Sequence, residues 1–377
     1  MKGTVAKVLL TELGIPNNGY VSWPQRLEYL TQHYPDNQLD YLICGHTEKE
    51  FNSAYTKRIL CKEHGRLSNK LFEGKRFEAF EQALASIAAE HSYVIVCVVD
   101  SIKLKNVLHS FLVNKGLDKK VKLVFYQCGY SYYLNYEEYV RFTRGISELI
   151  LLSRNGYHYE FHRYPDMPYP VHVLHNPIDH TIFKPLPQAE RQELRSKMKF
   201  EGATQFIWVS HDKPVKGLQV ILEAWKLFYN KEKNAVLHVV GVKRDETVPG
   251  VIFHGKIPNK ELPAWYQASD VFIFSPMRNE GYGLAVAEAI SCGCLGISTY
   301  AGGAVDFFKE GEHGIGISEP NFLDTWAAAF DKAIADLPAF REAHKDDHLK
   351  PPPFATYNEW CAGFMNIFAN MEKRLLL

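Results

Sequence analysis

Short runs of almost wholly apolar residues recur along this chain and alternate with stretches whose apolar residues follow helical spacing. Runs that are apolar on both faces are typical of strands buried inside a parallel sheet. Strands that alternate with helices form βαβ units, so we predict an α/β fold. The expected strands are VAKVLL, LDYLICG, YVIVCVVD, KLVFYQCG, ELILLS and VHVLHN, followed by QFIWVS, AVLHVVG, VIFHG, DVFIFSP and LGISTY.

The alternation is interrupted once, at residues 175–193, where HNPIDHTIFKPLPQAERQE carries three prolines and few apolar residues. This segment is the best candidate for a linker. It divides the chain into residues 1–180 and 181–350, and each part has a size that forms one doubly wound, Rossmann-like domain. Residues 351–377 begin with a run of prolines and continue as an amphipathic helix, which needs a surface to cover.

Composition excludes several classes of protein. The 377 residues include 43 basic and 43 acidic side chains, so no net charge favours binding to nucleic acid. No apolar run has the length of a membrane span or a signal peptide, and we expect a cytoplasmic protein. The seven cysteines are scattered inside apolar runs and are expected to be free thiols. Cys292 and Cys294 match no metal-binding spacing, so no metal site is predicted.

The stretch PMRNEGYGLAVAEAISCGC places two carboxylates, Glu280 and Glu288, around a glycine-flanked tyrosine. Glu280 follows the run DVFIFSP, at the carboxyl end of an expected strand, where doubly wound sheets bind ligands. The helix that follows starts without bulk, so the amides of Gly283, Leu284 and Ala285 can face a diphosphate. Glu288, about two turns into the helix, can receive ribose hydroxyls, and Glu280 can receive those of a group beyond the phosphates.

A structural interpretation of the same carboxylates stays open. Glu280 can simply favour the helix dipole, and Glu288 can be a solvated helix residue. Against this, Glu288 interrupts a helix of small apolar residues, where a charge without a partner is costly.

A second candidate lies in VSHDKPVKGLQVILEAW, where an expected strand ends and Lys213, Lys216 and Gly217 precede a helix. A lysine at a helix start can neutralise a phosphate, although a lysine in an exposed turn is often only solvated. Both turns lie at carboxyl ends of strands in the same half of the chain. We therefore expect them to face one pocket.

The order of these motifs closely resembles the carboxyl half of retaining glycosyltransferases of family 4, which have the GT-B fold. The resemblance covers roughly residues 171–317. It is carried by HNPIDHTIF, VSHDKPVKG, AVLHVVG, VIFHGKIPNKELPAWYQASDVFIFSPMRNEGYGLAVAEAISCG and YAGGAVDFFKEGEHGIGI, in that order. It implies two Rossmann-like domains facing across a cleft, with an acceptor-side amino domain and a carboxyl domain that binds a nucleotide diphosphate sugar. It also implies that the last helix returns to the amino domain.

In that family the two glutamates of an E-x7-E motif contact the donor. By position Glu280 would meet the transferred sugar and Glu288 the ribose, while Lys216 and the amides at Gly283 and Leu284 would hold the diphosphate. Glu280 and Lys216 are the catalytic candidates, and no metal or other cofactor is implied. The donor-binding candidates are His211, Lys213, Lys216, Lys256, Ile257, Glu280, Gly281, Tyr282, Gly283, Leu284, Ala285 and Glu288.

Three positions depart from the family pattern. His211 stands where the family usually has an arginine, so grip on the phosphates depends on Lys213 or becomes sensitive to pH. The first loop, IPNNGYVSW, offers only Gly19 in place of a glycine pair. Cys128 follows KLVFYQ where a histidine is common, and Tyr130 begins a tyrosine-rich segment that suits either a carbohydrate or a domain interface. Gly19, Cys128 and Tyr130 are the candidates for the amino-domain cleft.

The sequence therefore predicts transfer of a sugar from a nucleotide diphosphate sugar to a hydroxyl-bearing glycan, glycolipid or small molecule. A lysine-rich segment, IKLKNVLHSFLVNKGLDKKVK, permits peripheral membrane contact, but a basic helix packed on its own sheet is favoured. Three alternatives stay open: a sugar-nucleotide epimerase of the same fold, a catalytically silent relative that binds sugar nucleotides, and an interaction protein without nucleotide affinity. A dehydrogenase and a P-loop NTPase lack their glycine motifs here.

Overall fold

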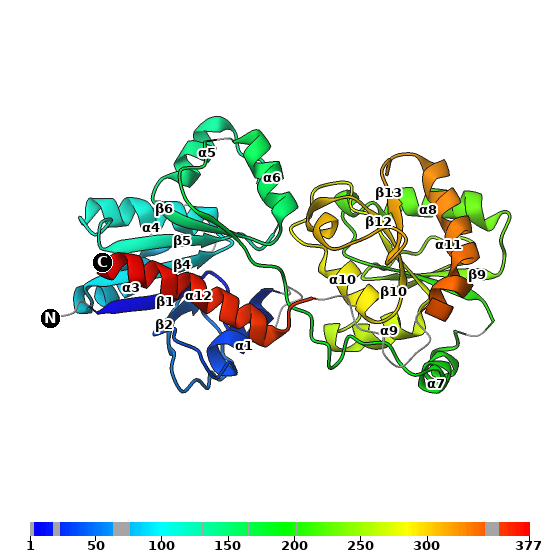
Figure 1. The fold of residues 1–377 in the computed structure, drawn as a ribbon, viewed down its shortest axis with the longest axis horizontal. Helices are drawn as coiled ribbons and strands as arrows, with labels where there is room; N and C mark the ends of the chain where they lie inside the picture. The colour runs from blue at the N-terminus through cyan, green and yellow to red at the C-terminus, as the bar shows by residue number, and fades with distance from the viewer. Residues whose placement is uncertain are drawn as a thin grey trace. The chain divides into compact units, whose positions relative to one another are not determined.

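The computed structural model describes residues 4–17, 23–62, 76–129, 132–164, 166–200, 202–343 and 354–377. The chain divides into two compact units, one of Met1–His175 with Tyr357–Leu377 and one of Asn176–Thr356. The boundaries predicted from the sequence were residues 180 and 350, and the resemblance implied that the last segment returns to the amino domain. Each unit is an α/β domain built on one parallel sheet (Figure 1).

The sheet of the first unit is parallel throughout, with the strand order β3-β2-β1-β4-β5-β6-β7 in the described residues. Strand order reverses direction between β1 and β4, which pair through Val5–Tyr93 to Leu10–Val98. The strands are β1 (Val5–Thr11), β2 (Tyr41–Gly45), β3 (Lys57–Cys61), β4 (Tyr93–Val99), β5 (Val121–Tyr126), β6 (Ile146–Leu151) and β7 (Val171–Val173).

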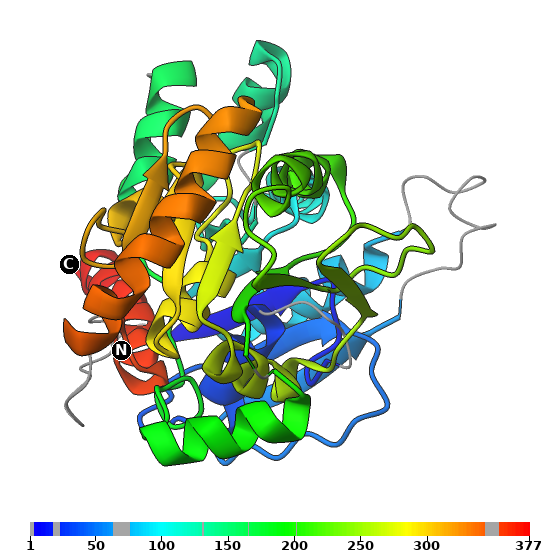
Figure 2. The ribbon, with the colours of Figure 1, turned by 90° about the vertical axis from the view of Figure 1, so that its right-hand side faces the viewer.

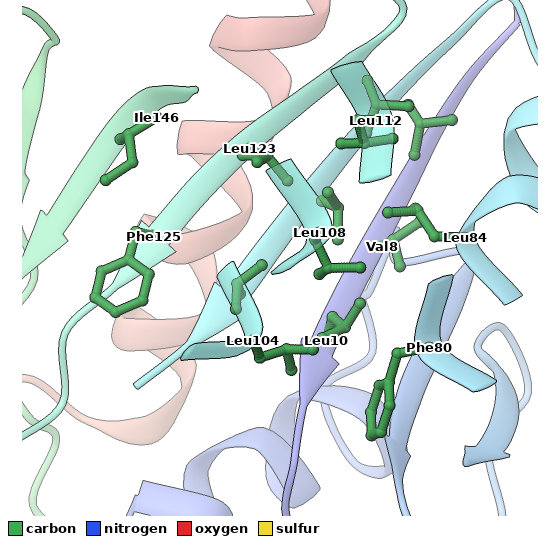
Figure 3. Close-up of a cluster of buried hydrophobic side chains, with 14 of the residues drawn as sticks. Val8, Leu10, Phe80, Leu84, Leu104, Leu108, Leu112, Leu123, Phe125 and Ile146 are labelled. Atoms are coloured by element: carbon green, nitrogen blue, oxygen red, sulfur yellow. The ribbon is translucent and has the colours of Figure 1, made fainter. Parts of the chain in front are cut away.

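Helices cover both faces of this sheet, and their apolar stripes form its core. Figure 3 shows Leu84 of α3 and Leu104 of α4 directed toward β1, where Val8 and Leu10 lie, and Phe80 of α3 belongs to the same buried cluster. The Ser101 hydroxyl caps α4 by accepting from the Leu104 amide. The helices are α1 (Trp23–Gln32), α3 (Glu78–Glu90), α4 (Ile102–Asn114), α5 (Tyr136–Thr143), α6 (Arg154–Arg163) and α12 (Tyr357–Leu376).

The last helix, α12, packs against the first unit, beside α1 and over β4 (Figure 1). Its buried face includes Trp360, Phe364 and Phe368. Two ion pairs add to this packing, from Arg374 to the buried Glu148 of β6 and from Glu372 to Lys7 of β1, the latter at 2.8 Å.

The sheet of the second unit is also parallel, with the order β10-β9-β8-β11-β12-β13, and its strand order reverses between β8 and β11. The strands are β8 (Thr204–Val209), β9 (Ala235–Val240), β10 (Val251–Gly255), β11 (Val271–Phe274), β12 (Leu295–Thr299) and β13 (Gly314–Ile317). The helices are α7 (Gln188–Met198), α8 (Leu218–Tyr229), α9 (Leu262–Ala268), α10 (Leu284–Ser291) and α11 (Leu323–Ala343), with 3-10 turns at Pro214–Lys216, Asn259–Glu261 and Gly302–Asp306.

Aromatic side chains fill the core between α8, α11 and this sheet. In Figure 2, α11 is drawn in orange in front of the yellow strands. The Trp225 ring of α8 lies 5.2 Å from Phe206 of β8 and 5.7 Å from Phe330 of α11, measured between ring centroids. All three side chains are fully buried, and burial of such large rings is a main source of stability for the unit.

The two parallel sheets and their helices confirm the α/β prediction with two doubly wound, Rossmann-like domains. The strands that the sequence predicted are present, and the structure adds β3 and β13 to them.

Candidate functional site

The reversal of strand order in the second unit determines where a ligand can bind. In doubly wound sheets, ligands bind outside the carboxyl ends of the strands at the point where strand order reverses. Here that point lies between β8 and β11, which end at Val209 and Phe274. The loops that follow these two strands carry Lys216 and Glu280, so the fold brings both predicted catalytic residues to the same edge.

Lys216 and Glu280 contact each other directly. The Lys216 Nζ lies 2.7 Å from Glu280 Oε1, and the two side chains are 14% and 20% exposed. The other carboxylate oxygen, Oε2, is buried and has no hydrogen-bond partner among the residues that the structure describes. Burying a carboxylate oxygen without a hydrogen-bond donor costs folding free energy. This oxygen is therefore available to accept a hydrogen bond from a hydroxyl group of a ligand.

The backbone around Lys216 is held by the neighbouring strand end. The Ser275 hydroxyl donates to the Lys216 carbonyl at 2.9 Å and accepts from the Trp208 indole N–H at 2.9 Å. The next residue, Gly217, has φ of +74°, and a Cβ there would lie 2.1 Å from the Ser275 carbonyl oxygen. Only glycine fits this close approach, which keeps the Lys216 turn against the loop after β11.

The backbone of Glu280 is held from the other side by the glycine pair Gly302-Gly303. The Gly303 amide donates to the Glu280 carbonyl at 2.9 Å. Gly302 has φ of +66°, and a Cβ there would lie 1.7 Å from the same carbonyl oxygen. The glycines of YAGGAVDFF, which the sequence analysis used only as part of the resemblance, therefore position Glu280.

Helix α10 begins directly after this loop. Gly283 occupies its N-cap with φ of +91°, and no side chain caps the helix. The preceding Tyr282 is buried and lies 5.0 Å from the Phe307 ring, measured between centroids, so it is a packing residue, while Gly281 is partly buried. The helix start, including Leu284 and Ala285, thus presents backbone amides and a positive dipole end next to Glu280.

Basic side chains surround the same edge. Partial burial of the ring lowers the pKa of His211, and the charges of Lys213, Lys216 and Lys256 lower it further. The three lysines therefore form one cationic region around His211, which is mostly neutral near pH 7. His211, Lys213 and Lys256 are exposed, and Ile257 is partly buried.

Glu288 belongs to α10 and lies beside Tyr266 of α9. Its carboxyl is partly buried beside the Tyr266 side chain. Burial raises the pKa of Glu288 to about 8, and the Tyr266 hydroxyl acts in the opposite direction. The carboxyl group is therefore mostly protonated at neutral pH and is poised to ionise when hydrogen-bond donors approach it.

The Glu288→Gln variant is expected to unfold at a higher temperature than the unmodified protein. Below the unfolded-state pKa near 4.5 the carboxyl group is protonated in both states, and the stability of the fold is fully present. As the pH rises from there through the folded-state pKa of about 8, the unfolded state ionises first and this stability is lost. At pH 7 the cost corresponds to about 3 kcal/mol, which is absent in the glutamine variant. Thermal unfolding at pH 5 and pH 8 measures it. The gain should grow with pH, whereas Glu190→Gln on the exposed face of α7 should give none at either pH.

In the first unit, Cys128 follows β5, and Gly19 and Tyr130 lie outside the described residues. The Asp100 carboxylate accepts from the amides of Cys128 at 2.9 Å and Gly129 at 3.1 Å. Asp100 has φ of +54°, which is unusual for aspartate, and the sequence analysis did not single it out. Burial raises the pKa of the Cys128 thiol, although Arg26 acts against this, so the group is a thiol at neutral pH.

Two features are absent from the residues that the structure describes. No group of three or more His, Cys, Asp or Glu side chains in these ranges is arranged to hold a metal ion. No helix in the same ranges combines the length and the apolar character that crossing a bilayer requires.

Residues 190–346 match the family model described as glycosyl transferases group 1. This range contains both loops of the candidate site. The match shows similarity to group 1 glycosyltransferases over less than half of the chain. Among curated relatives, the D-inositol 3-phosphate glycosyltransferase of Xylanimonas cellulosilytica is 31% identical over 144 residues, and the mannosylfructose-phosphate synthase of Agrobacterium fabrum is 24% identical over 164 residues. The aligned part is 38% of this chain in both cases, and the chain spans only 33% and 36% of these relatives.

Solved glycosyltransferase structures share the whole fold. Sucrose-phosphate synthase from Thermosynechococcus elongatus superposes with a TM-score of 0.75 at 12% identity, covering 98% of this chain and 100% of that one. Anabaena HepE, determined in complex with UDP and glucose, gives 0.71 at 14% identity, covering 97% and 100%. The predicted GT-B fold is therefore confirmed.

Proposed function

We propose that the protein is a retaining glycosyltransferase of the family 4 type that uses a nucleotide diphosphate sugar as donor. The observation that carries the proposal is the meeting of Lys216, Glu280 and the start of α10 at the reversal point of the second sheet. The relatives support it, because the one from Xylanimonas cellulosilytica is named a glycosyltransferase and HepE was determined with UDP and glucose.

In this proposal the diphosphate lies at the start of α10. The amides of Gly283 and Leu284 and the Lys216 ammonium stabilise the charge that grows on the departing diphosphate. Lys213 and Lys256 raise the local concentration of the anion, while His211 lies beside them mostly neutral near pH 7, and the segment at Lys256 and Ile257 lies against the base. Glu288 receives the ribose hydroxyls.

Glu280 positions the transferred sugar. Its buried Oε2 accepts a sugar hydroxyl, and its charge favours an oxocarbenium-like state. We do not assign it the role of the nucleophile in a retaining glycosidase, which requires a second carboxyl group about 5 Å away. Among the described residues, its contact is instead a lysine. The departing phosphate can accept the acceptor's proton on the same face, so no enzyme base is required.

The resemblance assigns the hydroxyl acceptor to the first unit. Cys128 and Asp100, at the carboxyl ends of β5 and β4, are the described residues at the corresponding edge of that sheet. The acceptor is expected to be a glycan, glycolipid or small molecule, in the cytoplasm, and no metal or nucleic acid takes part.

The experiment is an assay of donor consumption. The protein is incubated with UDP-, GDP- and ADP-sugars, with and without a mixture of sugar, sugar phosphate and polyol acceptors, and release of nucleoside diphosphate is measured. Acceptor-dependent release, with a product of the donor's anomeric configuration by NMR, supports the proposal. Consumption of donor without acceptor, giving an epimer, favours an epimerase. Binding of donor without consumption under any condition favours a silent relative.

A further inference from the structure

Lys216 and Glu280 neutralise each other in the structure, although the proposed reaction requires both charges for the ligand. The Lys216 ammonium contacts Glu280 Oε1 at 2.7 Å, and both side chains are largely shielded from water. A diphosphate at the start of α10 would attract the same ammonium group. The carboxylate and the diphosphate therefore compete for one cation.

We propose that Glu280 is a specificity-determining residue, which holds Lys216 until an intact sugar nucleotide exchanges the ammonium for its diphosphate and offers sugar hydroxyls to the released carboxylate. This inference rests on the proposed function and goes beyond it, because it predicts that the same residue favours the intact donor and disfavours the product diphosphate.

The surroundings allow this exchange without movement of the backbone. Ser275 holds the Lys216 carbonyl at 2.9 Å, and Gly303 holds the Glu280 carbonyl at 2.9 Å. A Cβ at Gly217 or Gly302 would collide with the facing carbonyl oxygen, so each loop packs closely against its neighbour. Only the two side chains need to rotate, which is fast compared with catalysis.

The state of the second carboxylate oxygen explains the preference for the intact donor. Oε2 of Glu280 is buried and lacks a donor within the described residues. If the ammonium group moved to a bare nucleoside diphosphate, Oε1 would lose its partner and Oε2 would still have none. Leaving both carboxylate oxygens without hydrogen bonds costs free energy. Sugar hydroxyls restore these hydrogen bonds, so the exchange is favourable only with the sugar attached. After transfer the carboxylate recaptures Lys216 and promotes release of the diphosphate.

The test compares binding by calorimetry of a nucleoside diphosphate and the corresponding sugar nucleotide to the full-length protein. In the Glu280→Gln variant, affinity for the diphosphate should rise by about 3- to 10-fold, because a competing, partly shielded ion pair is removed. Affinity for the sugar nucleotide should not rise in parallel. In a Lys216→Ala background, Glu280→Gln should leave diphosphate affinity unchanged, because the contested cation is absent.

Asp212→Asn is the matched control for charge. Asp212 is exposed in the same cationic loop and pairs with Arg244 at 2.9 Å rather than with Lys216. An equal gain in Asp212→Asn would overturn the proposal in favour of a general charge effect. Unchanged or weaker diphosphate binding in Glu280→Gln, with an unfolding midpoint near that of the unmodified protein, would also overturn it. If neither protein binds any nucleotide, the proposed function fails together with the inference.

Discussion

Replacing Lys216 by alanine is expected to reduce sugar transfer by about 10²- to 10³-fold, the range seen when one preorganised group that stabilises developing charge is removed. The ammonium group lies beside Glu280 at the start of α10, where charge develops on the departing diphosphate in the proposed mechanism. The loss should appear in kcat as well as in kcat/KM, because the leaving group is more negative in the transition state than in the bound donor. Steady-state kinetics with the donor identified by the consumption assay provide the measurement.

The control for this variant is Lys226→Ala. Lys226 is an exposed lysine of α8 that pairs only with Glu223, at 2.8 Å, on its own helix among the contacts that the structure describes. Its kinetics should equal those of the unmodified protein. Normal turnover by Lys216→Ala, with an intact unfolding transition, would contradict the assigned catalytic role.

The Asp270→Asn variant should lose about 3 kcal/mol of unfolding free energy, the cost of leaving partly buried arginine charges without their shared partner. Asp270 precedes β11 and is almost fully buried. Its carboxylate contacts Arg191 at 2.5 Å, Arg195 at 3.1 Å and Arg341, and it accepts from the Gln205 amide. Burial by itself raises the pKa of Asp270, but the charges of Arg191, Arg341 and Arg195 outweigh it and hold the pKa below its usual value.

Denaturant unfolding monitored by tryptophan fluorescence measures this loss. Asp331→Asn, on the exposed side of α11, is the control and should change stability by less than about 0.5 kcal/mol. An Asp270→Asn variant as stable as this control would show that the arginines find other partners. Because α7 supplies Arg191 and Arg195, the same contacts fix the helix after the interdomain segment to the second unit.

The elements that the sequence predicted best are those with a strong period. The fully apolar runs became strands, and the two loops that were expected to share one edge follow β8 and β11, which are neighbours in the sheet. The motif from Pro276 to Cys294 indicated Glu280, Gly283 and Glu288, because charges in an apolar helix and glycines at its start need a reason.

What the sequence did not reveal depends on contacts between distant segments. The pairing of Lys216 with Glu280 joins two loops 64 residues apart, and no local pattern indicates that one neutralises the other. The approach of Gly302 to the Glu280 backbone, the Asp270 cluster and the role of Asp100 are of the same kind. Strand β3 was missed because three of its five residues are charged or exposed, so it lacks the apolar pattern of a buried strand.

The most direct test of the donor site is a thermal-shift screen of the protein against UDP, GDP, ADP, CDP and dTDP and their sugars, followed by calorimetry of the best ligand. We expect one base to stabilise the protein, by about 2.7 kcal/mol when the ligand is present at 100 times its Kd, and both Lys216→Ala and Glu288→Ala to weaken that binding. Absence of binding by every nucleotide, or binding that neither variant weakens, would contradict a donor site at the reversal point of the second sheet.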